Sequence, residues 1–526
     1  MGLLIFLIVF PIFLLAYFFY GSFLNNLFGV DPKRKTPAHA HYDGVDYIPA
    51  KNWLVLFGHH FSSIAGAGPI IGPVIAVMLW GWLPALIWVV VGTIFIGGVH
   101  DFGALIVSVR EKGSSISDIA QHVISKRAKV LFSLFVWLAL ILVISVFAYL
   151  CADTFVKEAK IVLPSLGLIP VAMIVGYLLY HLNTNTFLST ILGLLCLAGL
   201  ILLGNSLPIS ASINTWLLVL FAYCYLASVL PVNILLQPRD YLSSFLLFFG
   251  VAVGFAGLFL ANPKINMPFY HRWVTPEGFL WPAMFVTVAC GAISGFHALI
   301  ASGTTSKQID TEIHARRIGY GGMLAEGLVA VLAVISVAVL FNRGENFSSI
   351  LKNNGPIEIF GRGYSVITHK VLGTYGKFIA VTILNAFILT TLDTATRIAR
   401  YLTEELFLVK NRYISTLLII FTSAALTFSG KWNKIWPVFG ASNQLVAALA
   451  LFVLSCWLIA RKKTIKFTLW PALFMFITTV AALLLQMVKY FKNSDYVLFV
   501  ITIFLLGLAG FMAYEVMSII RRVNAE

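Results

Sequence analysis

The chain has 526 residues, of which 60% are hydrophobic and only 11% are charged. A soluble protein of this size cannot bury so much apolar surface, so the composition predicts an all-α polytopic membrane protein. The formal net charge of +15 is scattered over short loops. This distribution argues against a nucleic-acid partner and favours contact with anionic membrane lipid.

Apolar runs of spanning length recur along the whole chain. The first run, from Gly2 to about Tyr20, lacks a basic leader and an A-x-A cleavage site, so we interpret it as a retained helix. About fifteen runs are long enough to cross a bilayer. They are 2–24, 53–79, 83–109, 128–152, 166–181, 187–204, 213–236, 241–261, 281–304, 322–341, 372–396, 412–429, 436–460, 468–488 and 495–520.

Basic residues in the loops predict the topology. The side away from the N-terminus carries about 23 Lys and Arg residues and the other side about 12. This places the N-terminus outside and the C-terminus in the cytoplasm. The stretch from Ile116 to Lys126 has the apolar spacing of a short interfacial helix. The longest polar connections are interpreted as loops or lids; they are 30–52, 262–280, 305–320 and 342–371.

The span from Trp53 to about Trp80 contains three glycines and two prolines between Gly66 and Pro73. Proline lacks the N–H group that a helix needs, and glycine weakens a helix. An interrupted membrane helix persists only where it is buried or lines a wet cavity. Such a break offers carbonyl oxygens, as at Ala65, to a cation, and helix N-termini to an anion. The pattern predicts a secondary-transporter site that includes Gly66 and Gly68, with a purely structural kink as the alternative.

A second interruption is predicted in the run 213–236, where Pro231 lies among small polar residues that include Ser228 and Asn233. It is the sixth span counted from the first interruption. Two interrupted helices five spans apart are typical of a core built from inverted repeats of five plus five helices. The predicted organisation is an N-terminal helix and cytoplasmic loop, a transporter core and C-terminal accessory helices. Their ranges are 1–52, 53–400 (repeats at about 53–204 and 213–396) and 401–526.

Ionisable residues are costly inside a membrane, so those within the spans are candidates for function. His59, His60 and His297 join Gly66, Gly68, Ser228 and Asn233 as candidates for substrate binding, although a membrane histidine often only joins two helices. Asp393 and Arg397 are one helical turn apart and predict an ion-paired clamp or gate. Arg239 and Asp240, which follow the second interruption, are assigned to the same gate.

Two coupling ions remain open. The hydroxyl groups of Ser302, Thr304 and Thr305, with the unwound carbonyl group at Ala65, would form an oxygen cage suited to Na⁺. Coupling to H⁺ would instead require a group that titrates. The candidates for that role are His60, His100, Asp101 and Glu326.

Several motifs resemble those of the carbon starvation protein A family. They run from Gly58 to Pro73, Gly98 to Phe102, Gln237 to Leu242, Ser294 to Gln308, Thr391 to Arg397 and Trp436 to Leu445. The resemblance implies a transporter of the bacterial plasma membrane, within the amino acid–polyamine–organocation superfamily and with its LeuT-type fold. Members take up peptides or pyruvate, often under nutrient limitation. This chain looks shorter than many members.

The main hypothesis is therefore a secondary active importer of peptide or pyruvate, driven by H⁺ or Na⁺, with no enzymatic activity, resident cofactor or metal. The alternative is an intramembrane metal or haem enzyme that uses the buried histidines, although the sequence contains no HExxH spacing. A nutrient sensor would need a soluble signalling domain, and ATP-driven transport would need a GxxxxGK[ST] loop; neither is found. The oligomeric state is left open.

Overall fold

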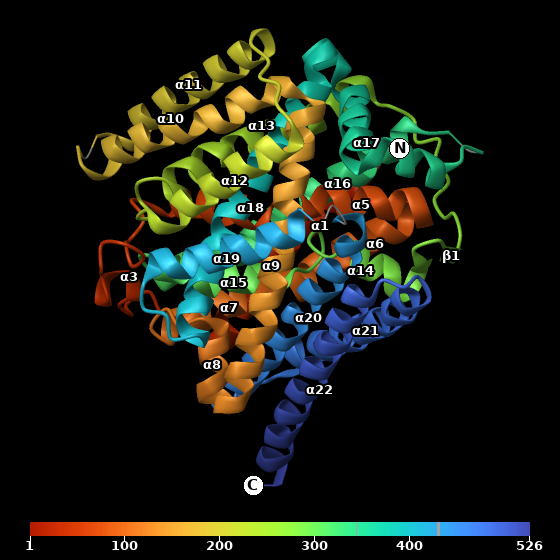
Figure 1. The fold of residues 1–526 in the computed structure, drawn as a ribbon. Coiled ribbons are helices and arrows are strands. Elements are labelled where there is room, and N and C mark those ends of the chain that lie inside the picture. Colours follow the sequence, from red (N-terminus) through yellow and green to blue (C-terminus); the bar gives the residue numbers. More distant parts are fainter. Residues whose placement is uncertain (183, 343, 429–431, 526) are drawn as a thin grey trace.

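The computed structural model describes residues 1–182, 184–342, 344–428 and 432–525, and the chain folds into a bundle of helices (Figure 1). The helices of the first half are α1 (Gly2–Leu15), η1 (Ala16–Tyr20), α2 (Gly21–Phe28), α3 (Pro37–Ala40), α4 (Trp53–Ile64), α5 (Gly68–Trp80), α6 (Trp82–Gly92), η2 (Thr93–Gly97), α7 (Gly98–Arg110), α8 (Ile116–Val123), α9 (Lys126–Lys157), η3 (Ala159–Ile161), α10 (Val162–Tyr180), α11 (Thr186–Ser206), α12 (Ile213–Val229) and α13 (Leu236–Ala261).

The second half begins with a small antiparallel hairpin, β1 (Val274–Thr275) and β2 (Gly278–Phe279). The helices that follow are η4 (Leu280–Met284), α14 (Phe285–Thr287), α15 (Gly295–Gly303), η5 (Thr305–Lys307), η6 (Glu312–His314), η7 (Arg316–Tyr320), α16 (Gly321–Leu340), α17 (Phe347–Leu372), η8 (Gly373–Tyr375), α18 (Gly376–Leu406), α19 (Arg412–Thr427), α20 (Trp432–Ile459), α21 (Lys466–Lys492) and α22 (Tyr496–Ala525).

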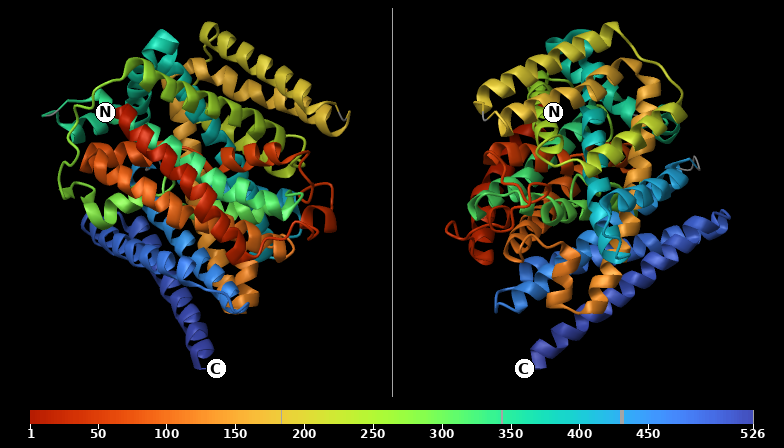
Figure 2. Two further views of the ribbon diagram at one scale, coloured as in Figure 1. Left: turned by 180° about the vertical axis from the view of Figure 1, so that it is seen from behind. Right: turned by 60° about the vertical axis from the view of Figure 1, so that its left-hand side comes forward.

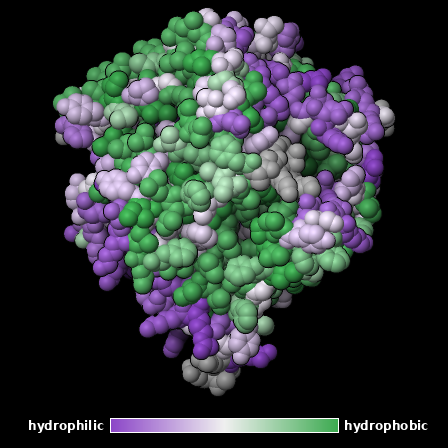
Figure 3. Space-filling model, in the orientation of Figure 1, coloured by the Kyte–Doolittle hydropathy of each residue, from purple (hydrophilic) through white to green (hydrophobic). Residues whose placement is uncertain are grey.

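The long helices are suited to a membrane. Among the described residues, twelve helical segments are long and apolar enough to cross a bilayer, and α12 and α19 are shorter apolar helices. In Figure 3, hydrophobic side chains cover the middle of the visible face, and hydrophilic side chains gather at opposite margins. The protein is therefore a multi-pass membrane protein, while the expected number of about fifteen spans stays a prediction.

Two central helices organise the bundle. The long helices α9 and α18 pack along each other, and the hairpin of α10 and α11 lies at one edge of the molecule (Figures 1 and 2). The C-terminal helices α20, α21 and α22 pack together, with the end of α22 projecting away from the bundle. The predicted interfacial helix is present as α8, which packs its apolar face on α9.

The structure confirms the first predicted interruption. Helix α4 starts after Asn52, whose side chain accepts hydrogen bonds from two backbone N–H groups, and ends at Ile64. Residues 65–67 are not helical, and α5 begins at Gly68 with Pro69 in its first turn. Proline suits this position because its φ is already helical and its missing N–H group has no intrahelical partner there. The two prolines and the glycines thus start a new helix.

The predicted second interruption was wrong in its position. Helix α12 continues without a break to Val229, and Pro231 lies in the turn before α13, where its missing N–H group costs nothing. The break lies instead in the expected span 281–304, between α14 and α15, where residues 288–294 form turns. A β-carbon on Gly295 would overlap α20 at Asn443 and Val446, so glycine permits the close approach that seats α15.

The stretch 342–371 was predicted to be a loop, but most of it forms α17. Its polar residues lower the mean hydropathy, and it kinks at Gly355, where φ is +76°, next to Pro356. Beyond the kink, buried residues recur at helical spacing, including Ile359, Tyr364 and Ile367. They pack against α13, α16 and α18. Burial against other helices, which the local composition does not reveal, therefore stabilises α17.

Candidate functional site

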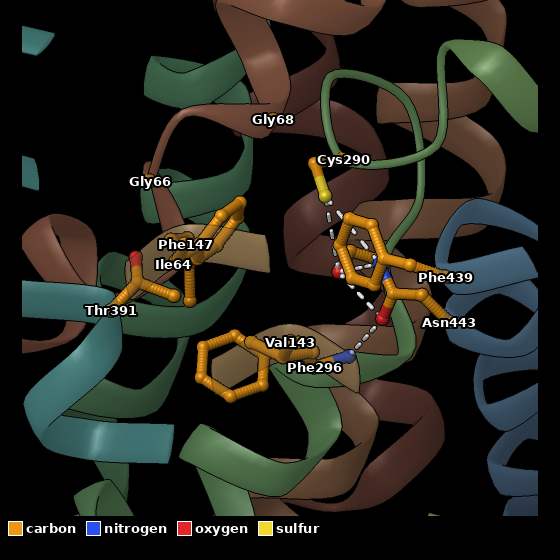
Figure 4. A pocket seen from close by; sticks show the side chains of 11 residues that line it. Ile64, Gly66, Gly68, Val143, Phe147, Cys290, Phe296, Thr391, Phe439 and Asn443 are labelled. Atoms are coloured by element: carbon orange, nitrogen blue, oxygen red, sulfur yellow. Dashed lines mark hydrogen bonds between the residues drawn. The ribbon is translucent and has the colours of Figure 1, made fainter. Parts of the chain in front are cut away.

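The two interruptions meet at a small enclosed cavity (Figure 4). Its volume of about 10 Å³ is room for about one water molecule. Six elements supply its lining: the α4–α5 break, the turn before α15, the start of α15, and helices α9, α18 and α20. The lining residues are Ile64, Gly66, Gly68, Val143, Phe147, Cys290, Ser294, Phe296, Thr391, Phe439 and Asn443. The cavity thus lies at the point where both spans lose their helical backbone.

Gly66 and Gly68 let the first break approach its neighbours. A β-carbon on Gly66 would overlap the Thr391 hydroxyl group on α18, and one on Gly68 would overlap the Cys290 side chain of the second break. No rotation of Cys290 relieves the second overlap, because its own β-carbon is involved. The sequence analysis correctly singled out this stretch, and the structure adds what the glycines contact.

Asn443 of α20 holds the second break in place. Its Oδ1 accepts hydrogen bonds from the Phe296 backbone N–H (2.9 Å) and the Ser294 hydroxyl (3.2 Å). Its Nδ2 lies 2.9 Å from Ser294 Oγ and 3.4 Å from Cys290 Sγ. The first N–H groups of a helix lack intrahelical partners. The Asn443 amide on α20 provides an acceptor for one of them, the Phe296 N–H at the start of α15.

Beside the cavity lies a buried cluster of titratable side chains, defined here as the proton cluster: His60, His100, Asp101, His297 and Glu326. His60 Nδ1 is 2.8 Å from Thr305 Oγ1, and His60 Nε2 is 2.9 Å from Asp101 Oδ2. His297 Nε2 is 3.2 Å from Glu326 Oε2. All five side chains are inaccessible to solvent, and they come from α4, α7, α15 and α16.

Each ring nitrogen of His60 has an oxygen within hydrogen-bond distance. A neutral His60 can donate from Nε2 to Asp101 and accept from the Thr305 hydroxyl at Nδ1, whereas a protonated His60 donates at both nitrogens. Among the described residues, Asp101 Oδ1, both Glu326 oxygens and both His100 nitrogens have no hydrogen-bond partner. Burying a charge without a partner is costly, so a charge placed in this cluster requires a partner from a neighbouring helix.

A second histidine pair joins α4 to α13. His59 Nδ1 is 2.7 Å from Asp240 Oδ2, and the Ser62 hydroxyl donates to the Asp240 backbone carbonyl at 2.8 Å. Both partners of the pair are fully buried. His59 and Asp240 therefore connect the first interrupted span to α13, and neither lines the cavity.

The predicted ion pair between Asp393 and Arg397 is not formed. Asp393 accepts hydrogen bonds from Arg239 of α13 and from the Tyr223 hydroxyl of α12 at 2.5 Å. The Arg239 guanidinium group also lies 5.5 Å from the centre of the Tyr223 ring, in cation–π contact. Asp393 and Arg397 are one helical turn apart on α18, but each forms its hydrogen bonds with residues of other segments.

Arg397 pairs instead with the segment before α4. Its Nη1 is 2.9 Å from Asp46 Oδ1, and Tyr401 donates to the same oxygen at 2.5 Å. Arg400 Nη2 is 3.5 Å from Asp46 Oδ2. Burial opposes ionisation of Asp46, but the charges of Arg397, Arg400 and Lys307 prevail and lower its pKa. Asp46 therefore fastens residues 43–50 across the end of α18.

The hydroxyl groups expected to form a sodium cage have different hydrogen-bond partners. Ser302 and Thr304 donate to carbonyl groups of their own helix, Ala298 (2.7 Å) and Ile300 (3.0 Å). Only Thr305 reaches α4, through His60. The break is faced by α18 instead, where Thr391 donates to the Ser63 carbonyl at 3.4 Å. Ala65, in the break itself, is buried.

Ser228 and Asn233, expected at the substrate site, lie elsewhere. The Ser228 hydroxyl is 3.3 Å from Thr416 of α19, and Asn233 lies in the turn after α12. The predicted site residues did not include most of the cavity lining: Val143, Phe147, Cys290, Ser294, Phe296, Thr391, Phe439 and Asn443. Gly291, Ser294 and Gly295 were a signal for the second break, since small residues cluster there without a proline.

The interrupted spans, the enclosed site and the buried ionisable groups define a polytopic membrane transporter. Comparison with known sequences gives its family: residues 1–348 and 342–482 match the carbon starvation protein CstA family, to which the chain belongs. The resemblance seen in the motifs is thereby confirmed.

Named relatives are transporters. The peptide transporter CstA of Campylobacter jejuni is 31% identical, with 92% of this chain and 80% of the relative covered. The Bacillus subtilis peptide transporter CstA is 33% identical over 84% of this chain and 82% of its own length. The pyruvate/proton symporter BtsT of Escherichia coli is 30% identical over 90% of this chain and 80% of its own length.

The fold has a solved counterpart. A mutant of the Eremococcus coleocola manganese transporter superposes with a TM-score of 0.56 at 14% sequence identity. The match covers 91% of this chain and 99% of the other. At this identity the match establishes a shared fold and nothing about the substrate.

Proposed function

We propose that this protein is a secondary active importer that carries a small organic nutrient, a peptide or pyruvate, into the cell together with H⁺. The observation that carries the proposal is the proton cluster, in which His60 of the first interrupted span meets Asp101, and His297 of the second meets Glu326. Protonation there changes the charge between the moving spans and their neighbours, which is how an ion gradient can bias two conformations.

Two observations favour H⁺ over Na⁺. The hydroxyl oxygen of Thr305, the third member of the expected sodium cage, lies 2.8 Å from Nδ1 of the titratable residue His60. The cluster residues hold five titratable groups with several unpartnered atoms. His297 also follows Phe296, which lines the cavity, so both residues belong to the first turn of α15.

The substrate would enter the cavity once it opens. Helices α5 and α15 both begin there, at Gly68 and Gly295, and the positive ends of their dipoles favour a carboxylate group. A peptide C-terminus and pyruvate share that group. Val143, Phe147 and Phe439 supply an apolar wall for the rest of the molecule.

The relatives and the hydrophobic surface support a place in the bacterial plasma membrane, with import during carbon limitation. The proposed topology has the N-terminus outside and the C-terminus in the cytoplasm. We retain the inverted-repeat core as part of the proposal, but the break at 288–294 favours a second repeat that begins near residue 280 rather than at 213. The metal-enzyme alternative gains no support from the relatives, which are named as transporters.

Uptake of labelled pyruvate and of di- or tripeptides into proteoliposomes tests the proposal, with pH and Na⁺ gradients imposed separately. Glu326→Gln should abolish pH-driven uptake yet keep substrate exchange between the two sides, because exchange needs no net proton movement. Glu277→Gln, which changes an exposed carboxylate of the β-hairpin, is the matched control. Full pH-driven uptake by Glu326→Gln, or uptake driven by Na⁺ alone, would refute the proposed coupling.

A further inference from the structure

A second recess lies on the outer surface, away from the enclosed cavity. It is a groove of about 760 Å³ between α6–η2, η4–α14 and α21, and all the residues that line it are apolar or aromatic. Ile87, Val91 and Trp470 expose 55%, 44% and 67% of their surface there. On a membrane protein such a groove faces hydrocarbon, so acyl chains are its natural contents.

A polar pocket of about 740 Å³ adjoins the groove and shares Phe269 with it. Arg272 and His271 line this pocket. Arg272 is exposed, and no carboxylate pairs with it among the described residues. The nearby carboxylate, Glu345, already accepts a hydrogen bond from the Asn342 backbone N–H at 2.7 Å. The pocket therefore presents a positive charge that is available to an anion.

His271 holds the guanidinium group in position. Arg272 Nη2 lies 2.9 Å from His271 Nε2. Burial and the adjacent Arg272 charge lower the pKa of His271, so its ring is neutral at pH 7 and Nε2 accepts the hydrogen bond. The remaining N–H groups of Arg272 stay free to bind an anion in the forked manner typical of arginine and phosphate.

Backbone hydrogen bonds fix the segment that joins the pocket to the groove. The Phe269 carbonyl accepts from the Leu83 backbone N–H at 3.0 Å, and the His271 backbone N–H donates to the Trp80 carbonyl at 2.9 Å. Gly81 lies between these contacts with φ of +106°, and a β-carbon there would come within 2.6 Å of the Phe269 oxygen. Phe269 to Arg272 are thus fixed on the turn between α5 and α6.

From this arrangement we propose that the groove and pocket together form a binding site for one anionic phospholipid, with its phosphate on Arg272 and an acyl chain between α6 and α21. The headgroup must supply the selectivity, because the groove and the surrounding bilayer are equally apolar. The occupant would contact Met284 and Phe285, which lead into the second interruption, as well as the turn that follows α5.

The test measures bound lipid rather than transport, so its outcome is independent of the proposed function. Purified protein is reconstituted in nanodiscs of phosphatidylcholine with a minor fraction of phosphatidylglycerol, released into detergent and weighed by native mass spectrometry. The wild type should retain phosphatidylglycerol in preference to phosphatidylcholine. Arg272→Ala should reduce that preference about fivefold, the effect of losing one basic contact near a bilayer surface.

Three controls make the result specific. Lys264→Ala removes an exposed positive charge from the same loop but outside the pocket, and it should leave the retained lipid unchanged. Arg272→Lys should recover part of the preference, because lysine keeps the charge but not the fork. Excess glycerol phosphate, which has the headgroup charge without acyl chains, should not displace the lipid.

Five outcomes would overturn the site. Equal retention of both lipids by the wild type would show no headgroup selectivity, and an equal loss with Lys264→Ala would show only general surface charge. Release of the lipid by glycerol phosphate would show an anion site without an acyl-chain groove. Bound detergent alone, or a second copy of the chain on this face, would likewise contradict the proposal.

Discussion

The pairing of Arg239 with Asp393 makes a sharp prediction about stability. Their side chains are 1% and 0% exposed, and among the described residues Arg239 Nε and Nη2 have no other partner. Asp393→Asn leaves a buried guanidinium group that cannot lose its proton, which should cost about 3–5 kcal/mol of unfolding free energy. Arg239→Met should cost less, because the stranded Asp393 carboxyl group can take up a proton and become neutral.

The double variant Arg239→Met/Asp393→Asn should be no less stable than the more stable single variant, since it removes both charges. The unfolding free energy is measured by fluorescence during denaturant titration in mixed micelles, and the coupling energy follows from the four proteins. The same cycle for Asp393 with Arg397 should show a much smaller coupling, because their principal partners differ. Additive losses for Arg239 and Asp393, or a cost below about 1 kcal/mol for Asp393→Asn, would refute this reasoning.

Two further predictions concern the break and the segment before it. Gly68→Ala should abolish uptake, because the added β-carbon overlaps Cys290. Adding Cys290→Gly should restore part of the uptake rate. The control Gly199→Ala lies on α11 with no neighbour within 4 Å, and it should be neutral in the same uptake assay. Asp46 has a pKa below its usual 3.8, so its pairs stabilise the protein fully above that pH and are lost as the pH falls through the lowered value. The wild type should therefore exceed Asp46→Asn in unfolding temperature at neutral pH, with the difference shrinking only below pH 3.8; a difference that vanishes already at pH 5 would contradict the ion pairing.

Local chemistry made part of the site predictable. The cluster of prolines and glycines between Gly66 and Pro73 predicted an interruption because these residues act on the backbone of their own segment, and the break falls at residues 65–67. The buried histidines and carboxylates also stood out, since ionisable groups are rare in apolar spans. The partners of these groups could not be read in the same way: Asp101 lies 41 positions from His60, and Asp46 lies 351 positions from Arg397.

The errors share one physical cause. The run 213–236 contains a proline, yet its helix simply ends before Pro231, whereas the break before α15 is held by Asn443 from a distant helix. The polar composition of α17 predicted a loop, but the packing of Ile359 and Tyr364 against three helices stabilises it. The actual second break and α17 were thus both decided by contacts between remote segments, which outweighed the local preference.

The amino-acid sequence by itself determined that the chain is a polytopic membrane protein of the CstA family, with a backbone interruption near Gly66 and ionisable groups in its spans. These properties follow from hydropathy, backbone chemistry and shared motifs, which act over short stretches. Only the tertiary structure decided where the second interruption lies, which charges pair and which side chains enclose the cavity. Those outcomes depend on which helices become neighbours, because a buried charge or an open helix end takes its partner from whichever segment packs against it.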